Sequence, residues 1–223
     1  SIYFPKRVIP MLPEEISNNL CSLIPNEDRN VLVCKMNFTQ EGEINSYDFS
    51  ESIINSHKRF TYNEVEFLNQ NKDTNLSADI LNSINALDKL TKQLLNNRSK
   101  RYALEIESSE PTLSFGNEGN ISEIFIPKRL FAHQMIEEAM ISANICAAKF
   151  IKKHLGFGVY RIHEEPEHLE LENLKKFFSL KGLSTKSFSS PLEMINSFIK
   201  HVNKDEKNKI TNVLILQSLK RAC

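Results

Sequence analysis

Near the start of the chain, residues 30–38 place apolar side chains at alternate positions, which is typical of a β-strand. Residues 40–43 read as a turn, because Gly42 can adopt a positive φ. Residues 44–54 then return as a second strand-like stretch. This pattern predicts an antiparallel hairpin, and residues 111–115 and 121–126 predict another around a glycine-containing turn.

After residue 60, apolar residues recur at helical spacing in several segments of the chain. Thr61 followed three residues later by Glu64 is a capping-box pair, so a short helix is predicted to begin there. Residues 77–101 carry an apolar stripe at helical spacing, with basic residues crowding the last turns. Further helices are predicted over residues 168–180, 191–202 with Pro191 first, and from about 206 to the end.

The strongest helical pattern runs over residues 129–154. Its apolar stripe comprises Met135, Ile136, Ala139, Met140, Ala143, Cys146, Ala147, Phe150 and Ile151. We expect this helix to be largely buried, with its alanines spaced by four admitting a close neighbour. Gly156 is the predicted C-cap.

Residues 8–29 contain Pro10, Pro13 and Pro25, each of which restricts its own backbone and that of the preceding residue. The segment is therefore expected to be rigid and irregular as it leads into the first strand. A short strand is predicted over residues 159–163. Together the patterns indicate an α+β fold, rich in helices, with two or more antiparallel hairpins.

Composition narrows the possible classes of protein. The chain has 28 basic and 28 acidic residues among its 223, which argues against a strongly cationic, free-standing nucleic-acid binder. Contact with RNA in a local groove remains open. Neither a signal region nor an apolar run near 18 residues is present, so we expect neither secretion nor a transmembrane span. The start at Ser1 and a helical pattern still running at the last residue suggest an internal piece of a longer protein.

The cysteines Cys21, Cys34, Cys146 and Cys223 are scattered and form no Cys-x-x-Cys pair. They are expected to be free thiols in a reducing cytoplasm.

Side chains that could carry acid–base or metal chemistry are dispersed. No two aspartates stand in an Asp-x-Asp pair, and the paired glutamates, such as Glu137 and Glu138, point about 100° apart if helical. We interpret these charges as solvated. His163 and His168 lack the spacing of a zinc-binding helix. No catalytic residue and no metal ligand are therefore predicted within the chain.

Aromatic residues offer a different function. Tyr62 begins a predicted helix shortly after Lys58 and Arg59, and Phe157 stands between two glycines. Exposed rings of this kind can stack on the bases of single-stranded RNA. From the residues alone, an aromatic ring near the end of a secondary-structure element is more often a plug in the hydrophobic core.

Several sequence blocks carry a resemblance to a known family. They are the Pro-Met-Leu-Pro to Asp-Arg block at 8–29, residues 56–65, the Ile-Glu-Glu-Ala-Met-Ile block at 136–148, Tyr-Arg-Ile-His-Glu-Glu-Pro at 160–166, and residues 214–222. In this order they resemble the catalytic RNB domain of the RNase II / RNase R exoribonucleases. The opening Tyr-Phe-Pro and the Arg-Ile-His block resemble the RNase R branch more closely.

The resemblance implies a processive, hydrolytic 3′→5′ exoribonuclease that releases nucleoside 5′-monophosphates with Mg²⁺ held by aspartates. It implies that Tyr62 stacks on the terminal bases of single-stranded RNA, and that Phe157, or else Tyr160, closes the other side of the clamp. A cytoplasmic protein, monomeric and without a membrane partner, is expected.

The same resemblance implies what residues 1–223 lack as a partial RNB domain. The family's aspartate cluster would precede residue 1, its arginine motif would follow residue 223, and its cold-shock and S1-type OB domains lie elsewhere. This piece would then supply the channel wall and clamp. Two alternatives stay open: a non-catalytic relic that serves as an RNA-binding or scaffold fragment, and an unrelated helical interaction protein.

From these expectations, purified residues 1–223 should hydrolyse no RNA even with magnesium, because the metal-binding carboxylates would be absent. A time course with end-labelled single-stranded RNA measures this. Processive release of mononucleotides would contradict it.

Overall fold

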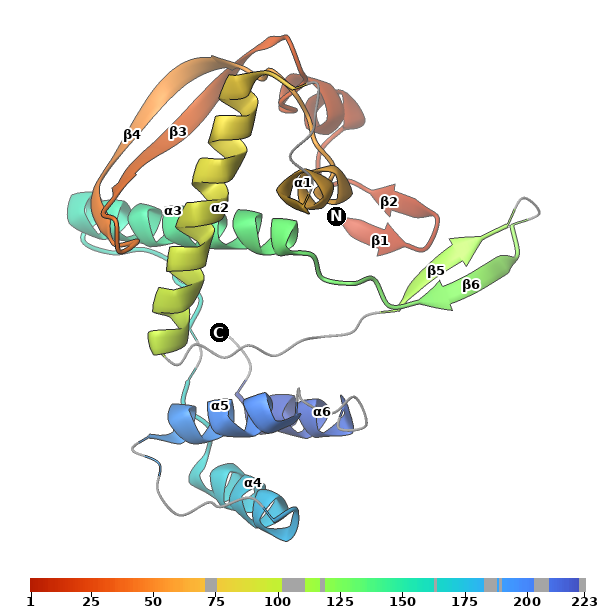
Figure 1. Ribbon diagram of the computed structural model, residues 1–223, viewed down its shortest axis with the longest axis vertical. Coiled ribbons are helices and arrows are strands. Elements are labelled where there is room, and N and C mark those ends of the chain that lie inside the picture. The colour runs from red at the N-terminus through yellow and green to blue at the C-terminus, as the bar shows by residue number, and fades with distance from the viewer. Residues whose placement is uncertain are drawn as a thin grey trace. The chain divides into compact units, whose positions relative to one another are not determined.

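The computed structural model describes residues 1–70, 76–101, 111–116, 119–162, 164–182, 188, 190–202 and 209–220. The chain divides into two compact units (Figure 1). The first unit comprises Ser1–Leu94 and Glu110–Phe150, and the second comprises Leu95–Ser109 and Ile151–Cys223. Each unit is described here by itself.

A long antiparallel hairpin, predicted from the alternation, dominates the start of the first unit. It is formed by β3 (Asp28–Phe38) and β4 (Ile44–Asn55), which pair from Asp28 opposite Asn55 to Phe38 opposite Ile44. Gly42 in the connecting turn has a φ of 79°, a conformation that costs glycine little and other residues more. The predicted hairpin and its turn are therefore confirmed.

The hairpin packs against the longest helix, α3 (Phe131–Leu155), through aromatic and sulfur-containing side chains. The rings of Phe49 and Phe150 lie 5.0 Å apart, centre to centre. Cys34 pairs with Phe49 across the hairpin, and its thiol hydrogen-bonds to Cys146, one helical turn before Phe150. Burial, and then the neighbouring Cys34, raise the pKa of the Cys146 thiol.

The proline-rich segment is more regular than the sequence suggested. Strands β1 (Ile2–Phe4) and β2 (Arg7–Ile9) form a short hairpin, and a π-helical turn, η1, spans Glu15–Leu20. Within the predicted irregular stretch 8–29, residues 10–13 and 21–27 form no helix or strand, so the prediction is confirmed there; it was wrong for the end of β2 and for η1.

The end of that segment is held by Arg29. Its Nε donates to the carbonyl of Ser22 at 3.1 Å, and its guanidinium also pairs with Glu27 at 2.6 Å. The backbone N–H of Asn26 donates to the carbonyl of Ser56 at 2.7 Å, which ties the segment to the residue following β4. Residues 20–29, which contain the Leu-Cys-Ser-Leu and Asp-Arg motifs, are therefore held together by contacts of Arg29 with Ser22 and Glu27.

The helix α2 (Ala78–Lys100) and the hairpin of β5 (Thr112–Phe115) and β6 (Ile121–Phe125) also match the sequence predictions. The ammonium of Lys6, between β1 and β2, donates to the carbonyl of Gly119 at 2.8 Å. This contact joins the two short hairpins of the first unit.

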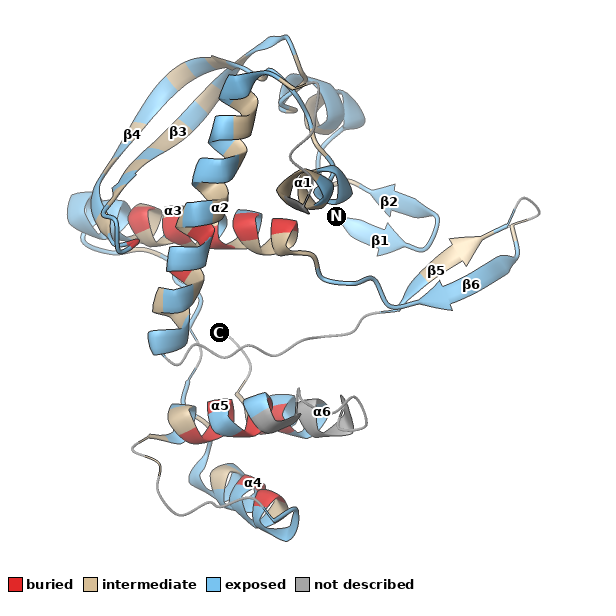
Figure 2. Ribbon diagram, in the orientation of Figure 1, coloured by how far each residue is buried: buried red, intermediate tan, exposed pale blue. Residues whose placement is uncertain are grey.

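Burial along α3 differs from the expected pattern. One face is buried, formed by Ala132, Met135, Glu138, Ser142 and Cys146, and it is coloured red in Figure 2. Ile136 and Met140 instead remain 42% and 59% exposed. The expectation of a largely buried helix was therefore wrong, because an apolar stripe does not show which of its edges a neighbour covers.

The second unit contains three helices around an apolar core. They are α4 (His168–Leu180), α5 (Pro191–Val202) and α6 (Lys209–Ser218). The core consists of Leu174, Phe178, Met194, Ile195, Phe198, Ile199 and Ile215. The rings of Phe178 and Phe198 stack at 3.8 Å, so this pair links α4 to α5 directly.

The strand predicted at 159–163 is not formed, since residues 159–162 are irregular and His163 lies outside the described residues. A stretch with alternating residues makes a strand only when a partner strand supplies hydrogen bonds. Gly156, with a φ of 76°, ends α3 as predicted. Within the described ranges, none of the helices combines the length and apolar character needed to cross a membrane.

Replacing Phe198 by Ala should destabilise the second unit by about 3–5 kcal/mol, because it empties the centre of a packed core. Chemical denaturation of the whole chain, followed by circular dichroism, measures the loss. Leu180→Ala is the matched control, since Leu180 is 90% exposed and should change stability by less than about 0.5 kcal/mol. Equal losses in both variants would contradict this description of the core.

Candidate functional site

Tyr62 is the first residue of α1 (Tyr62–Gln70), and the chain just before it forms the predicted capping box. The Thr61 backbone N–H donates to Glu64 Oε2 at 2.6 Å, and the Thr61 hydroxyl donates to the same oxygen at 2.8 Å. The Glu64 N–H donates back to Thr61 Oγ1 at 3.2 Å. These bonds fix the direction in which Tyr62 leaves the backbone.

One face of α1 docks on the first turns of α3. The ring of Tyr62 stacks on the imidazole of His133, with centres 4.0 Å apart and planes 20° apart. Glu66 Oε2 accepts a hydrogen bond from the Ala132 N–H at 3.2 Å. Residues spaced by three or four share a helix face, so this face aims both side chains at α3.

A further contact extends the same face, since Asn69 Nδ2 lies 3.7 Å from the sulfur of Met135. The Glu66 carboxylate also satisfies a backbone N–H that the start of a helix leaves without an intrahelical partner. The docking of α1 and the capping of α3 are therefore one interaction.

His133 is itself fixed in the first turn of α3. Its Nδ1 accepts the Leu130 N–H at 3.1 Å, and the His133 N–H donates to the Leu130 carbonyl at 3.1 Å. The first bond reproduces one half of a capping box, with an imidazole in place of the usual Glu or Gln, while the second is a backbone turn bond because Leu130 has no side-chain acceptor. Sequence reasoning assigned His133 no role. The signal that could have found it is its position three residues after Leu130.

The opposite face of α1 borders a separate hollow of about 510 Å³, lined by Lys58, Phe60, Asn63, Glu64, Phe67, Leu68 and Leu76. Tyr62 does not line this hollow. Its lining residues on α1 are rotated by about 100° or more from the face that contacts α3. The Tyr62 surface and the hollow are therefore distinct features of the first unit.

Tyr62 remains 44% exposed although one of its ring faces is covered by His133. Lys58 and Arg59 are exposed shortly before it. A partly exposed ring preceded in the sequence by two exposed cations is a combination that suits a base and its phosphate.

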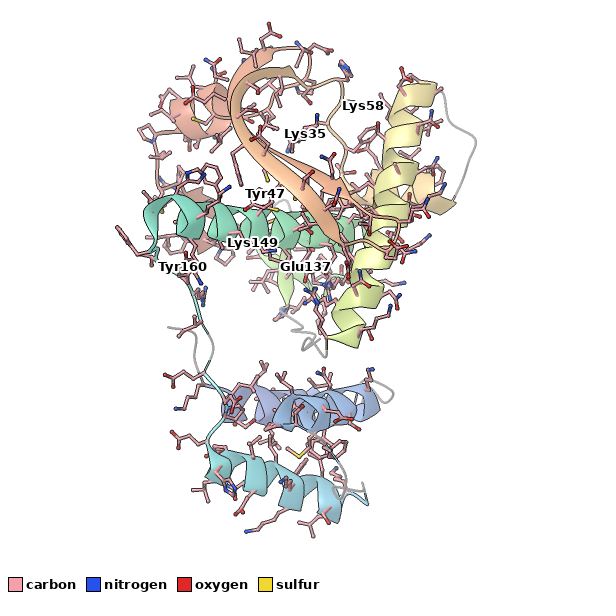
Figure 3. All side chains as sticks on the ribbon, turned by 90° about the vertical axis from the view of Figure 1, so that its left-hand side faces the viewer. Lys35, Tyr47, Lys58, Glu137, Lys149 and Tyr160 are labelled. Carbon is pink, nitrogen blue, oxygen red and sulfur yellow. The ribbon has the colours of Figure 1, made fainter. Side chains whose placement is uncertain are left out.

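The other two predicted site residues belong to the second unit. Phe157 is 76% exposed and Tyr160 is 42% exposed; Figure 3 shows Tyr160 beyond the C-terminal end of α3. Neither ring is a core plug. The pairing of Tyr62 with Phe157 or Tyr160 across a base stays a prediction.

The acidic residues on α3 were interpreted as solvated, and for Glu138 that was wrong, because it is only 2% exposed. Sequence alone missed this because neighbouring apolar residues suggested a different buried edge. A buried carboxylate requires polar partners, and such groups often mark functional sites. Glu137, labelled in Figure 3, pairs instead with Arg129.

Among the described residues, no three His, Cys, Asp or Glu side chains converge as metal ligands would. The described part of the chain therefore does not fit a catalytic Mg²⁺, which needs several oxygen ligands. We assign no step to a metal within it. Cys21, Cys34 and Cys146 are free thiols, while Cys223 lies outside the described residues.

Comparison with known proteins decides the family. The model of the RNB domain matches residues 1–223. The chain belongs to the RNB domain family. Ribonuclease R of Vibrio parahaemolyticus is 34% identical over 225 residues, which cover 100% of the chain and 27% of that protein. The family includes RNA-degrading exoribonucleases, and the relatedness to the RNase R branch confirms the predicted resemblance.

Solved structures show the same fold. Mycoplasma genitalium RNase R in complex with ribose-methylated single-stranded RNA matches 99% of the chain and 35% of that protein's chain, with a TM-score of 0.89 and 28% identity. Yeast Ssd1, a pseudonuclease, matches 99% of the chain and 26% of its own, with a TM-score of 0.69 and 16% identity. The second likeness concerns the fold alone. The predicted α+β RNB architecture is confirmed.

The capping box between Thr61 and Glu64 should make the stability of the folded chain depend on pH. The hydrogen bonds from the Thr61 N–H and hydroxyl lower the pKa of the Glu64 carboxyl below 4.5, and Lys58 contributes in the same direction. A lowered folded-state pKa adds stability above the unfolded-state value, and that stability is lost as pH falls through the folded-state pKa. The stability difference between wild type and Glu64→Gln should therefore shrink below about pH 4.5.

Denaturation of both proteins from neutral to acidic pH measures this difference. Glu14→Gln is the matched control, since Glu14 also precedes a helical turn but makes no side-chain cap hydrogen bond. A difference for Glu64→Gln that stays constant over the whole range would contradict the assigned cause.

Proposed function

We propose that residues 1–223 form part of the RNB catalytic domain of a hydrolytic 3′→5′ exoribonuclease that releases nucleoside 5′-monophosphates. Membership in the RNB domain family and the RNase R relatives support this proposal. The chain spans 27% of the length of the Vibrio parahaemolyticus relative, so activity belongs to the longer protein in this proposal.

The chain's own task in this proposal is to hold the RNA. A single-stranded RNA end would stack one base on the face of Tyr62 opposite His133, and the cations of Lys58 and Arg59 would lie near its phosphates. The observation that supports this most is that Tyr62 is held against His133, with ring centres 4.0 Å apart, and is still 44% exposed. Stacking tolerates every base, as an enzyme that degrades RNA stepwise requires.

Phe157, or else Tyr160, is proposed as the second side of the clamp. Their exposure leaves rings available for stacking. The carboxylates that hold Mg²⁺, which would polarise the phosphate and supply a hydroxide, are proposed to lie outside the described residues. A monomer is proposed for the complete enzyme, and the cytoplasm is its proposed location.

The alternative function is RNA binding without hydrolysis. It requires only exposed rings such as Tyr62, Phe157 and Tyr160, and no metal-binding carboxylates. Both proposals use Tyr62 in the same way. They differ in whether the complete protein shortens RNA, which a degradation assay of that protein with magnesium distinguishes.

Replacing Tyr62 by Ala in the complete enzyme should lengthen the smallest end product and weaken binding of the RNA 3′ end by about 1–3 kcal/mol. The reason is loss of the stacking surface for a terminal base. Gel analysis of the products measures the first effect, and titration with single-stranded RNA measures the second. Tyr62→Phe keeps the ring and is the matched control. An unchanged product ladder in Tyr62→Ala would remove Tyr62 from the clamp.

A further inference from the structure

One face of the Tyr62 ring is covered by the imidazole of His133. We propose that His133 is a positioning residue, which presents Tyr62 to RNA at a fixed angle. This inference rests on the proposed function of Tyr62. It assigns His133 no direct contact with RNA.

The imidazole can serve as a fixed surface because its own orientation is set by α3. Nδ1 accepts the Leu130 N–H at 3.1 Å, so rotation of the ring about its side-chain bonds would break a hydrogen bond. The backbone of the same residue is anchored through its N–H to the Leu130 carbonyl at 3.1 Å. A phenyl ring at this position could still stack on Tyr62, although it would lose this hydrogen bond.

The stack then transfers this orientation to Tyr62. With ring centres 4.0 Å apart and planes 20° apart, Tyr62 cannot tilt inward without colliding with the imidazole. Glu66 holds α1 to the adjacent Ala132 N–H at 3.2 Å, so the helix that carries Tyr62 cannot easily shift instead. A ring already ordered before RNA arrives loses less conformational entropy on binding.

Two substitutions separate the stacking role of His133 from its capping role. His133→Gln keeps an acceptor suited to the Leu130 N–H but removes the ring. His133→Phe keeps a ring that can stack on Tyr62 but removes the acceptor. If the stack on Tyr62 positions the ring, His133→Gln should lose affinity for the RNA end and His133→Phe should keep it. This result should not depend on the melting temperatures of the two variants.

The measurement uses the complete enzyme and a labelled single-stranded oligoadenylate in EDTA, together with product ladders in magnesium. His133→Gln should bind about 3–10-fold more weakly and lengthen the end product, and His133→Phe should stay within about twofold of wild type. The double variant Tyr62→Ala/His133→Gln should be no weaker than Tyr62→Ala alone, because His133 acts through Tyr62. His154→Asn, near the other end of α3, is the control and should bind normally.

The remaining outcomes separate the two proposals. If Tyr62→Ala changes binding and products while His133→Gln changes neither, positioning by His133 is overturned and the clamp role of Tyr62 stands. If Gln and Phe lose affinity equally with lowered melting temperatures, His133 only caps α3 and the inference is overturned. Additive losses in the double variant would also overturn it. No effect of Tyr62→Ala would reject the proposed function itself.

Discussion

The docking of α1 on α3 rests on the hydrogen bond between the Glu66 carboxylate and the Ala132 N–H, at 3.2 Å. The start of α3 exposes backbone donors with partial positive charge, and an acidic side chain from another helix satisfies one of them. Because that carboxylate sits on α1, capping α3 also decides where α1 lies. The Tyr62 ring, one turn earlier on the same face, is brought onto His133 as a consequence.

Local chemistry explains which parts of this fold could be predicted. The Thr61–Glu64 box, the Gly42 turn and Pro191 at the start of α5 each depend on residues within a few positions, so their signals lie in the sequence itself. The β3/β4 hairpin was predictable for the same reason, since a short turn joins its strands.

Features that depend on distant residues were less predictable. Glu138 is buried because of what covers α3, which its flanking apolar residues did not indicate. Residues 159–162 alternate like a strand but form none. For the site, Tyr62 came from the family resemblance together with its position at a helix start. Its partner His133 lies 71 positions further along the chain, a juxtaposition that only the docking of α1 on α3 creates.

The groups of this site hold the Tyr62 ring in a fixed orientation. Its groups are a ring, an imidazole, a carboxylate used as a cap, and exposed cations nearby, which suit holding a flexible polymer end. In the exoribonuclease proposed above, a surface that holds RNA would be separate from the acidic centre that cuts it, because each nucleotide must be held and then released. Stacking on one ring face provides moderate, sequence-tolerant affinity for this purpose.

The most direct test is a structure of the complete protein bound to single-stranded RNA. The account predicts one base stacked on the outer face of Tyr62 while His133 still covers the inner face. An RNA path that leaves the outer face of Tyr62 empty, or a Tyr62 ring enclosed by protein on both faces, would contradict it.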